Sequence, residues 1–181
     1  MEYTGIGSRE TPHQICQIMT QIARKFDAFG LTLRSGGADG ADNAFEICST
    51  KKKIYLPWED FNDKTGFVLS KSDHEKASMI AKRYVSHYDM LSYGAKKLHN
   101  RNVCQILDIK FDEPTDFVVC WTKDAKLIGG TATALKLAME FSIPIFNLAN
   151  YKDIDIMLSI STVSDIETVC NARIERDYNA S

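Results

Sequence analysis

Short apolar segments alternate with amphipathic segments along the first third of the chain. Residues 3–7, 31–34 and 54–56 are apolar runs of strand length. Between them, apolar residues recur at helical spacing, which predicts helices over 11–30 and 39–49. This β-α-β-α-β order predicts parallel strands joined by right-handed crossovers.

The remaining chain continues the alternation less regularly. Residues 116–121 and 145–148 are predicted strands, and residues 72–84, 91–107 and 131–141 are predicted helices. We therefore expect one Rossmann-like α/β domain with a parallel sheet of about five or more strands and helices on both faces.

Polar residues mark where two of the helices start. Thr11 is a candidate N-cap, with Gln14 at the capping-box spacing. Ser164 and Glu167 repeat this pattern before a C-terminal helix that runs toward Arg176. We expect the tail beyond 177 to fray.

The domain is expected to span residues 1–181, and segment 58–93 fits the pattern least. It could form a lid or insertion over the sheet edge, or it could pad that edge. No apolar run in the chain approaches the roughly 18 residues of a membrane helix, and no signal peptide is evident, so no membrane association is predicted.

Composition places the chain among ordinary globular proteins, with 44% hydrophobic and 25% charged residues. A net charge of −2 argues against a dedicated duplex-DNA binder, which usually has a basic face. The five cysteines are scattered without a C-x-x-C motif, which is typical of a reducing cytoplasm. The histidines lack metal-ligand spacing, so we predict no metal and no cofactor.

Two glycine-rich turns, at 33–42 and 128–134, carry the candidate chemistry. Each lies between a predicted strand and a predicted helix, where unpaired N–H groups and the helix dipole attract phosphate. A third loop, Gly7-Ser8-Arg9, follows the first strand, and ligands of open α/β sheets bind beyond such strand ends. The predicted phosphate or nucleotide site comprises Gly7, Ser8, Arg9, Ser35, Gly36, Gly37, Ala38, Asp39, Gly40, Asp42, Trp121, Gly129, Gly130, Thr131 and Thr133.

Several of these residues have an alternative interpretation. Asp42 could contact ribose or base, or could cap the second helix. Arg9 could bind phosphate or form a surface salt bridge, and Trp121 could stack on a base or pack in the core. Glu46 could face the same cleft, although surface exposure is the simpler expectation.

The motifs resemble two known families. Gly7-Ser8-Arg9 and the segment Ser35-Gly36-Gly37-Ala38-Asp39-Gly40-Ala41-Asp42 resemble the DprA/Smf pattern G-S-R … S-G-x-A-x-G-I-D. Segments 98–102 and 129–133 are similar to motifs of the LOG phosphoribohydrolases. Both families belong to the SLOG superfamily, and the overall resemblance, over 3–56 and 98–149, is to small phage-type DprA-like proteins.

This resemblance implies a nucleotide-binding, Rossmann-like protein that forms a homodimer or higher oligomer. In the LOG family an arginine and a glutamate act on an N-glycosidic bond. Arg101 matches that arginine and is the candidate catalytic residue, whereas Lys136 stands at the glutamate position. A lysine cannot supply carboxylate chemistry, and we expect Lys136 to pair with Glu140 one turn away.

The leading hypothesis is a cytoplasmic protein that binds a nucleotide or nucleotide derivative, either as an N-glycosidic hydrolase or as a sequestering or sensing protein. The alternative is a DprA-like mediator that binds single-stranded DNA. The second hypothesis has the same loops contacting a nucleic-acid backbone.

Overall fold

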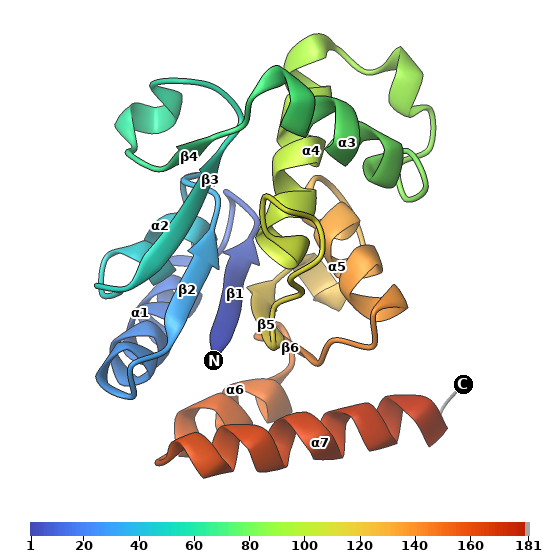
Figure 1. Ribbon diagram of the computed structural model, residues 1–181. Coiled ribbons are helices and arrows are strands. Elements are labelled where there is room, and N and C mark those ends of the chain that lie inside the picture. The colour runs from blue at the N-terminus through green and yellow to red at the C-terminus, as the bar shows by residue number, and fades with distance from the viewer. Residues whose placement is uncertain (180–181) are drawn as a thin grey trace.

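A computed structural model describes residues 1–179, and over this range the chain forms a six-stranded, fully parallel sheet between two layers of helices (Figure 1). The strand order is β4-β3-β2-β1-β5-β6. The strands are β1 Glu2–Gly7, β2 Thr32–Ser35, β3 Lys52–Leu56, β4 Phe67–Val68, β5 Phe117–Trp121 and β6 Ile145–Asn147. The predicted fold class is confirmed.

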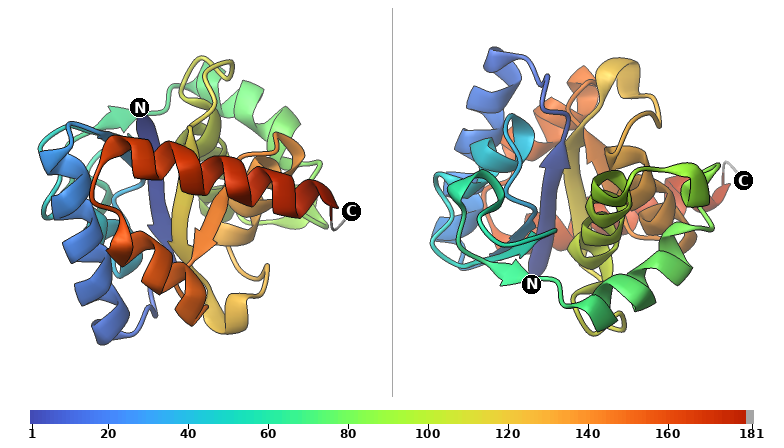
Figure 2. Two further views of the ribbon diagram at one scale, coloured as in Figure 1. Left: turned by 90° about the horizontal axis from the view of Figure 1, so that it is seen from below. Right: turned by 90° about the horizontal axis from the view of Figure 1, so that it is seen from above.

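Helices cover both faces of this sheet (Figure 2). α1, α2, α6 and α7 share one apolar cluster with the strands, while α4 and α5 cover the other face and α3 packs on α4. The helices are α1 His13–Ala28, α2 Ala41–Glu46, α3 Lys71–Ala81, α4 Tyr93–Leu107, α5 Thr131–Glu140, α6 Tyr151–Ser159 and α7 Val163–Asn179. Across residues 1–179, no helix is long and apolar enough to cross a bilayer.

Side-chain alternation along β1 explains the two layers. Tyr3 contacts Phe26 of α1 edge to face, with ring centroids 5.0 Å apart, and stacks on Phe117 of β5. Thr4 points to the opposite face, where its hydroxyl donates to the Gln105 carbonyl of α4 at 2.6 Å. This two-residue period is what a strand buried on both faces requires.

The first predicted helix start is wrong. Thr11 does not cap α1, because its hydroxyl donates to the carbonyl of Ser8 at 2.6 Å. Pro12 takes the N-cap position instead, and α1 starts at His13. Thr11 thus stabilises the turn after β1, which belongs to the loop carrying Arg9.

The second predicted helix start is wrong by two residues. The carboxylate of Asp165 accepts hydrogen bonds from the amides of Ser161 and Thr162, and the Asp165 amide donates to the Thr162 hydroxyl. Thr162 and Asp165 therefore have the capping-box arrangement that Ser164 and Glu167 were expected to have. The helix itself continues past the expected end to Asn179, and residues 180–181 lie outside the described range.

The sequence pattern missed β4 and α6 and overestimated α2. β4 has only two residues, both exposed, so it carries no apolar signal. α2 starts at Ala41 because the preceding Gly40 has a φ of +77°. A side chain there would also lie 2.6 Å from the Ser8 carbonyl, so only glycine fits this approach of two loops.

Segment 58–93 contributes to both the sheet and the helical layer. It contains a 3₁₀ turn at Phe61–Asp63, the edge strand β4 beside β3, and α3 against α4. Its role as a lid stays a prediction.

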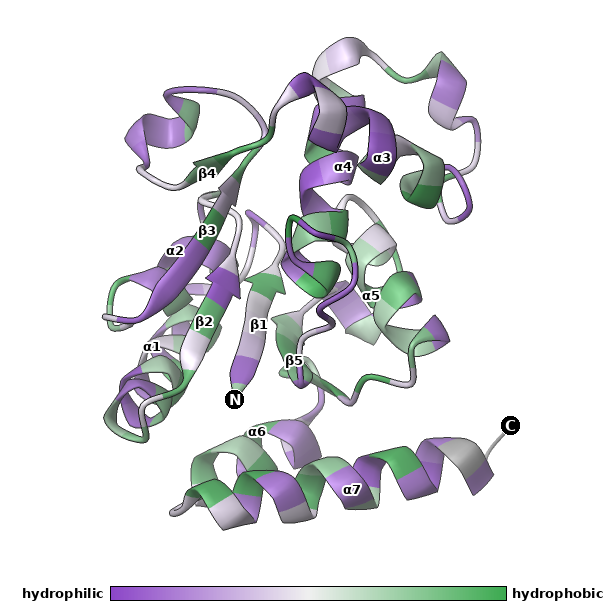
Figure 3. Cartoon of the chain, in the orientation of Figure 1, coloured by the Kyte–Doolittle hydropathy of each residue, from purple (hydrophilic) through white to green (hydrophobic). Residues whose placement is uncertain are grey.

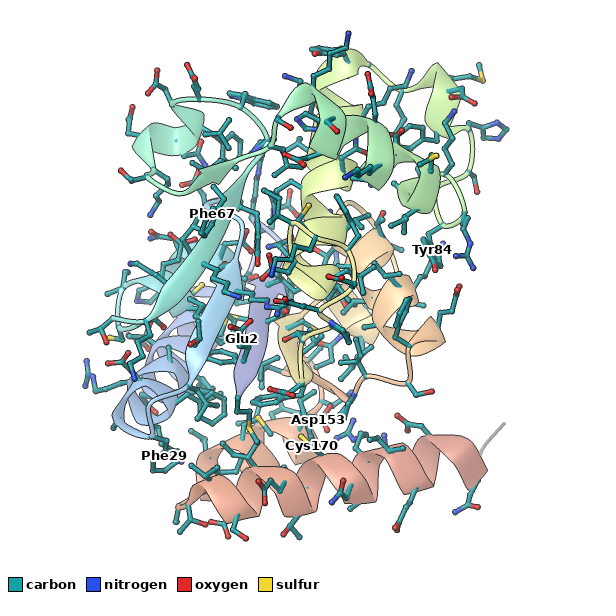
Figure 4. The ribbon with its side chains drawn as sticks, viewed as in Figure 1. Glu2, Phe29, Phe67, Tyr84, Asp153 and Cys170 are labelled. Atoms are coloured by element: carbon teal, nitrogen blue, oxygen red, sulfur yellow. The ribbon has the colours of Figure 1, made fainter. Side chains whose placement is uncertain are left out.

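An ion pair holds α7 at the end of the sheet where the strands begin (Figures 1 and 4). The guanidinium of Arg173 contacts the carboxylate of Asp153 in α6 and donates to the Ile145 carbonyl at 2.8 Å. Arg173 also lies 4.5 Å from the ring centroid of Phe146. At the opposite end of the sheet, where the strands terminate, lie the loops that follow β1, β2 and β5.

A four-residue charge cluster joins β1, β2, β3 and the turn after α4. Arg34 is 2% exposed and contacts Glu2 and Asp108, and Lys53 binds the same two carboxylates at 2.9 and 2.7 Å. Burial raises the pKa of each carboxyl, but the hydrogen bonds and charges of Lys53 and Arg34 outweigh it and hold both pKa values below their ordinary range.

This cluster predicts a loss of stability in acid. A carboxyl whose folded pKa is lowered stabilises the fold above its unfolded pKa, and that contribution disappears as pH falls through the folded value. We expect the urea midpoint to fall as pH drops below about 4, and to fall less steeply in Glu2→Gln, which is already weaker at neutral pH. If the urea midpoint falls equally steeply with pH in the parent and the variant, Glu2 does not cause the loss of stability in acid.

Candidate functional site

A cleft of about 450 Å³ lies at the carboxyl ends of β1 and β5. β1 has β2 on one side and β5 on the other, so the loops after β1 and β5 diverge at this point. Such a topological switch point is where open α/β sheets bind ligands. The cleft is lined by Gly7, Ser8, Arg9, Glu10, Ala38, Asp42, Leu98, Arg101, Asn102, Trp121, Thr122, Lys123, Ile128, Gly129, Gly130 and Thr131.

The structure brings together most of the residues singled out in the sequence. The members of the predicted site that line the cleft are Gly7, Ser8, Arg9, Ala38, Asp42, Arg101, Trp121, Gly129, Gly130 and Thr131. The members that do not line it are Ser35, Gly36, Gly37, Asp39, Gly40 and Thr133.

Two predicted hydroxyl contacts have partners inside the protein. Ser35, fully buried, donates to the carbonyl of Gly5 at 2.9 Å. The Thr133 hydroxyl lies 2.8 Å from Nδ1 of His99. These side chains hold the loops from within, and the lining of the cleft comes from other groups.

The amides of the first glycine-rich turn bind carboxylates of the chain itself. The amide of Gly37 donates to Oε1 of Glu46 at 2.9 Å, and the amide of Ala38 donates to Oδ2 of Asp42 at 3.3 Å. Glu46 is 3% exposed and also pairs with Lys64 at 3.3 Å, so its expected surface exposure is wrong. The protein thus supplies its own anions where a phosphate was expected.

Arg101 forms the floor of the cleft beside Asp42. Its Nη1 lies 3.3 Å from Oδ2 of Asp42 and 3.0 Å from Oε1 of Gln105, and its Nε has no acceptor among the described residues. A side chain at Gly36 would lie 2.1 Å from Nη1, so this glycine makes room for the guanidinium.

Burial controls the ionisation of this pair. It raises the pKa of Asp42 to about 6, with Arg101 acting in the opposite direction and Glu46 in the same one. Burial also lowers the pKa of Arg101, which Asp42 partly offsets. The pair is therefore a costly buried element whose two members depend on each other.

The groups free to meet an anion lie on the β1 and β5 side of the cleft. Arg9 and Lys123 are exposed, and neither has an ion-pair partner within residues 1–179. The amides of Gly129 and Gly130, just before α5, donate to no acceptor in the described chain. Two unpaired cations beside a helix N-terminus make this rim attractive to phosphate.

The expected pair of Lys136 and Glu140 is wrong. Glu140 instead accepts hydrogen bonds from Arg83 and from the hydroxyl of Tyr84, while Lys136 donates to the Tyr84 carbonyl at 3.1 Å. The chain just beyond α3 lies close enough to α5 to outcompete the local pair. Lys136 does not line the cleft.

The predicted site left out several lining residues, although the motifs at 98–102 and 128–134 contain three of them; the residues are Glu10, Leu98, Asn102, Thr122, Lys123 and Ile128. Asn102 connects α4 to the second glycine-rich turn by donating to the Gly130 carbonyl at 2.7 Å. Lys123 could have been predicted as a site residue, because it follows the end of β5 by two residues and ligands bind beyond such strand ends. Trp121 fits both of its interpretations, because it lines the cleft and packs against the apolar cluster of α1 and α2.

Within residues 1–179 there is no group of three or more His, Cys, Asp or Glu side chains placed to hold a metal ion.

Comparison with solved structures identifies a protein of similar fold. No family model and no curated protein matches the chain. A solved structure of DNA processing protein A from Helicobacter pylori, described for its single-stranded DNA binding mode, matches with a TM-score of 0.55 and 20% identity over 97% of this chain and 81% of that one. The chain therefore shares a DprA-like fold.

Proposed function

We propose that the cleft binds the sugar-phosphate backbone of single-stranded DNA. The observation that carries this proposal is the rim of the cleft, where Arg9, Lys123 and the free amides of Gly129 and Gly130 surround one hollow. The similar fold of a protein described as binding single-stranded DNA supports the same ligand class.

The arrangement of charges explains how a protein of net charge −2 can attract phosphate. Two nearby acidic groups are neutralised, because Asp42 faces Arg101 and Glu46 faces Lys64, while Glu10 also lines the cleft and has no ion-pair partner among the described residues. At the mouth of the cleft the two cations Arg9 and Lys123 outnumber the one unpaired carboxylate, Glu10, and leave a net positive charge. A few contacts of this kind give modest affinity with a shallow dependence on salt.

The test is the salt dependence of oligonucleotide binding. Because each phosphate contact on single strands adds about 0.7 to the slope of log K against log salt, Arg9→Ala and Lys123→Ala should each reduce the slope by roughly that amount. Fluorescence anisotropy with labelled oligo(dT) over a series of NaCl concentrations measures it. Lys126→Ala is the matched control, because Lys126 lies on the same loop, pairs with Asp124 and does not line the cleft. Unchanged slopes in both variants would contradict the proposal.

A free mononucleotide is the second candidate ligand, favoured by the size of the cleft, about 450 Å³, which falls within the range of small-molecule sites. A nucleotide at 100 times its Kd would add about 2.7 kcal/mol of stability, a clear rise in melting temperature. We propose binding without N-glycosidic cleavage, because Lys136 lies outside the cleft and Arg101 already neutralises Asp42. Chromatography of the incubated nucleotide tests this, and release of free base would overturn it.

A further inference from the structure

The helices α3 and α4 lie side by side (Figure 1), and a second hollow of about 510 Å³ is lined by residues of both. Its lining includes Lys71 and Lys82 from the α3 region and Tyr93, Lys96 and Lys97 from α4. We call it the α3–α4 groove. Figure 3 shows that much of α3 and the first turns of α4 are hydrophilic.

The groove is locally basic in an acidic protein. Its lining has four lysines against two carboxylates, Glu75 and Asp89, whereas the whole chain has a net charge of −2. Lys82 pairs with Asp89 at 2.8 Å, and Lys96 donates to the Asp89 carbonyl at 2.8 Å. Lys71 and Lys97 have no ion-pair partner in the described chain, so their charges are available to a ligand.

An exposed aromatic ring accompanies these cations. Tyr93 is 76% exposed, and Nζ of Lys97 lies 4.8 Å from its ring centroid. Deeper in the groove, the Tyr88 hydroxyl donates to the buried amide oxygen of Asn100, which also binds the His74 carbonyl through its nitrogen. Unpaired lysines beside an exposed aromatic ring are the parts from which single-strand binding surfaces are built.

α4 forms a common wall between the groove and the cleft. One side of α4 supplies Lys97 and Asn100 to the groove, and another side, over the same turns, supplies Leu98, Arg101 and Asn102 to the cleft. Lys97 in the groove and Leu98 in the cleft are consecutive residues of α4, so the two hollows adjoin along this helix.

We infer that the α3–α4 groove binds further nucleotides of the single-stranded DNA whose backbone the cleft holds. A base stacks on Tyr93, and Lys71 and Lys97 contact phosphates. This inference rests on the proposed function of the cleft and extends the DNA-binding surface from the cleft to the neighbouring groove on α4.

Oligonucleotide length separates the two sites. We expect Lys71→Glu/Lys97→Glu and Tyr93→Ala to weaken binding of a dT16 strand about tenfold, because they remove phosphate contacts and a stacking face. The same variants should bind dT4, which fills only the cleft, within about twofold of the parent. Lys76→Glu is the matched control, because Lys76 is exposed on α3 but does not line the groove.

The outcomes are distinguishable. If the groove variants bind dT16 as tightly as the parent does, or lose dT4 and dT16 affinity equally, the groove inference is overturned while cleft binding stands. If neither oligonucleotide binds the parent protein, the proposed function itself fails. Melting temperatures of all variants close to the parent's show that the losses are local.

Discussion

Replacing Arg101 with methionine is expected to lower the free energy of unfolding by about 3–5 kcal/mol, because removing one partner of a buried ion pair leaves the other charge uncompensated. Asp42 is 2% exposed and would lose its cation, while Gln105 would lose a hydrogen-bond donor. Urea denaturation of parent and variant at neutral pH measures the loss.

The pH dependence of this loss has a definite sign. The folded pKa of Asp42 is about 6, already above its ordinary value because of burial, and it rises further without Arg101. A carboxyl with a raised folded pKa weakens the fold as pH increases through that range, so the variant should lose more stability at about pH 7.5 than at about pH 5. Asp42→Asn/Arg101→Met should recover part of the loss, because it removes the unpaired charge. A change of less than about 1 kcal/mol in Arg101→Met would mean that the guanidinium is free for a ligand and would restore its candidacy as a catalytic residue.

The pattern of apolar positions was sufficient for the central fold because β1, β2, β3 and β5 are short and largely buried, with helices of ordinary length between most of them. β4 escaped notice because pairing with β3, rather than its own pattern, makes it a strand. The helix start at Thr11 was misplaced because its hydroxyl donates to the Ser8 carbonyl instead of accepting from a helix amide. The start at Ser164 was misplaced because Thr162, a residue of the same capping type, caps the helix two residues earlier.

The site could be located from the sequence because glycine-rich loops at parallel strand ends meet at a switch point. The direction in which their amides point could not be predicted. The carboxylates that bind the amides of Gly37 and Ala38 belong to Glu46 and Asp42, and only tertiary folding brings them there. The same glycine motif would be present if those amides faced a ligand. In the first turn the amides of Gly37 and Ala38 are therefore satisfied within the protein, whereas in the second turn those of Gly129 and Gly130 have no acceptor among the described residues.

Replacing Gly130 with leucine is expected to weaken oligonucleotide binding by about 2 kcal/mol, roughly 30-fold in Kd. The backbone of Gly130 is helical, with φ −63° and ψ −39°, so any residue can adopt it. A Cβ atom there would meet only Nδ2 of Asn102, at 3.7 Å. The leucine side chain therefore enters the cleft without clashing with the fold, and the unfolding free energy should change by less than about 1 kcal/mol.

Two further variants make this prediction specific. Ala172→Leu places the same side chain on the exposed surface of α7, away from the cleft, and should bind like the parent. Gly129→Leu, unlike Gly130→Leu, should lower the free energy of unfolding by about 1–2 kcal/mol, because the φ of +68° at residue 129 strains any side chain. If Gly130→Leu binds oligonucleotide as tightly as the parent, the second glycine-rich turn is not the binding surface. Its free amides would then only connect β5 to α5, and the anion attraction of the cleft would depend on Arg9 and Lys123 alone.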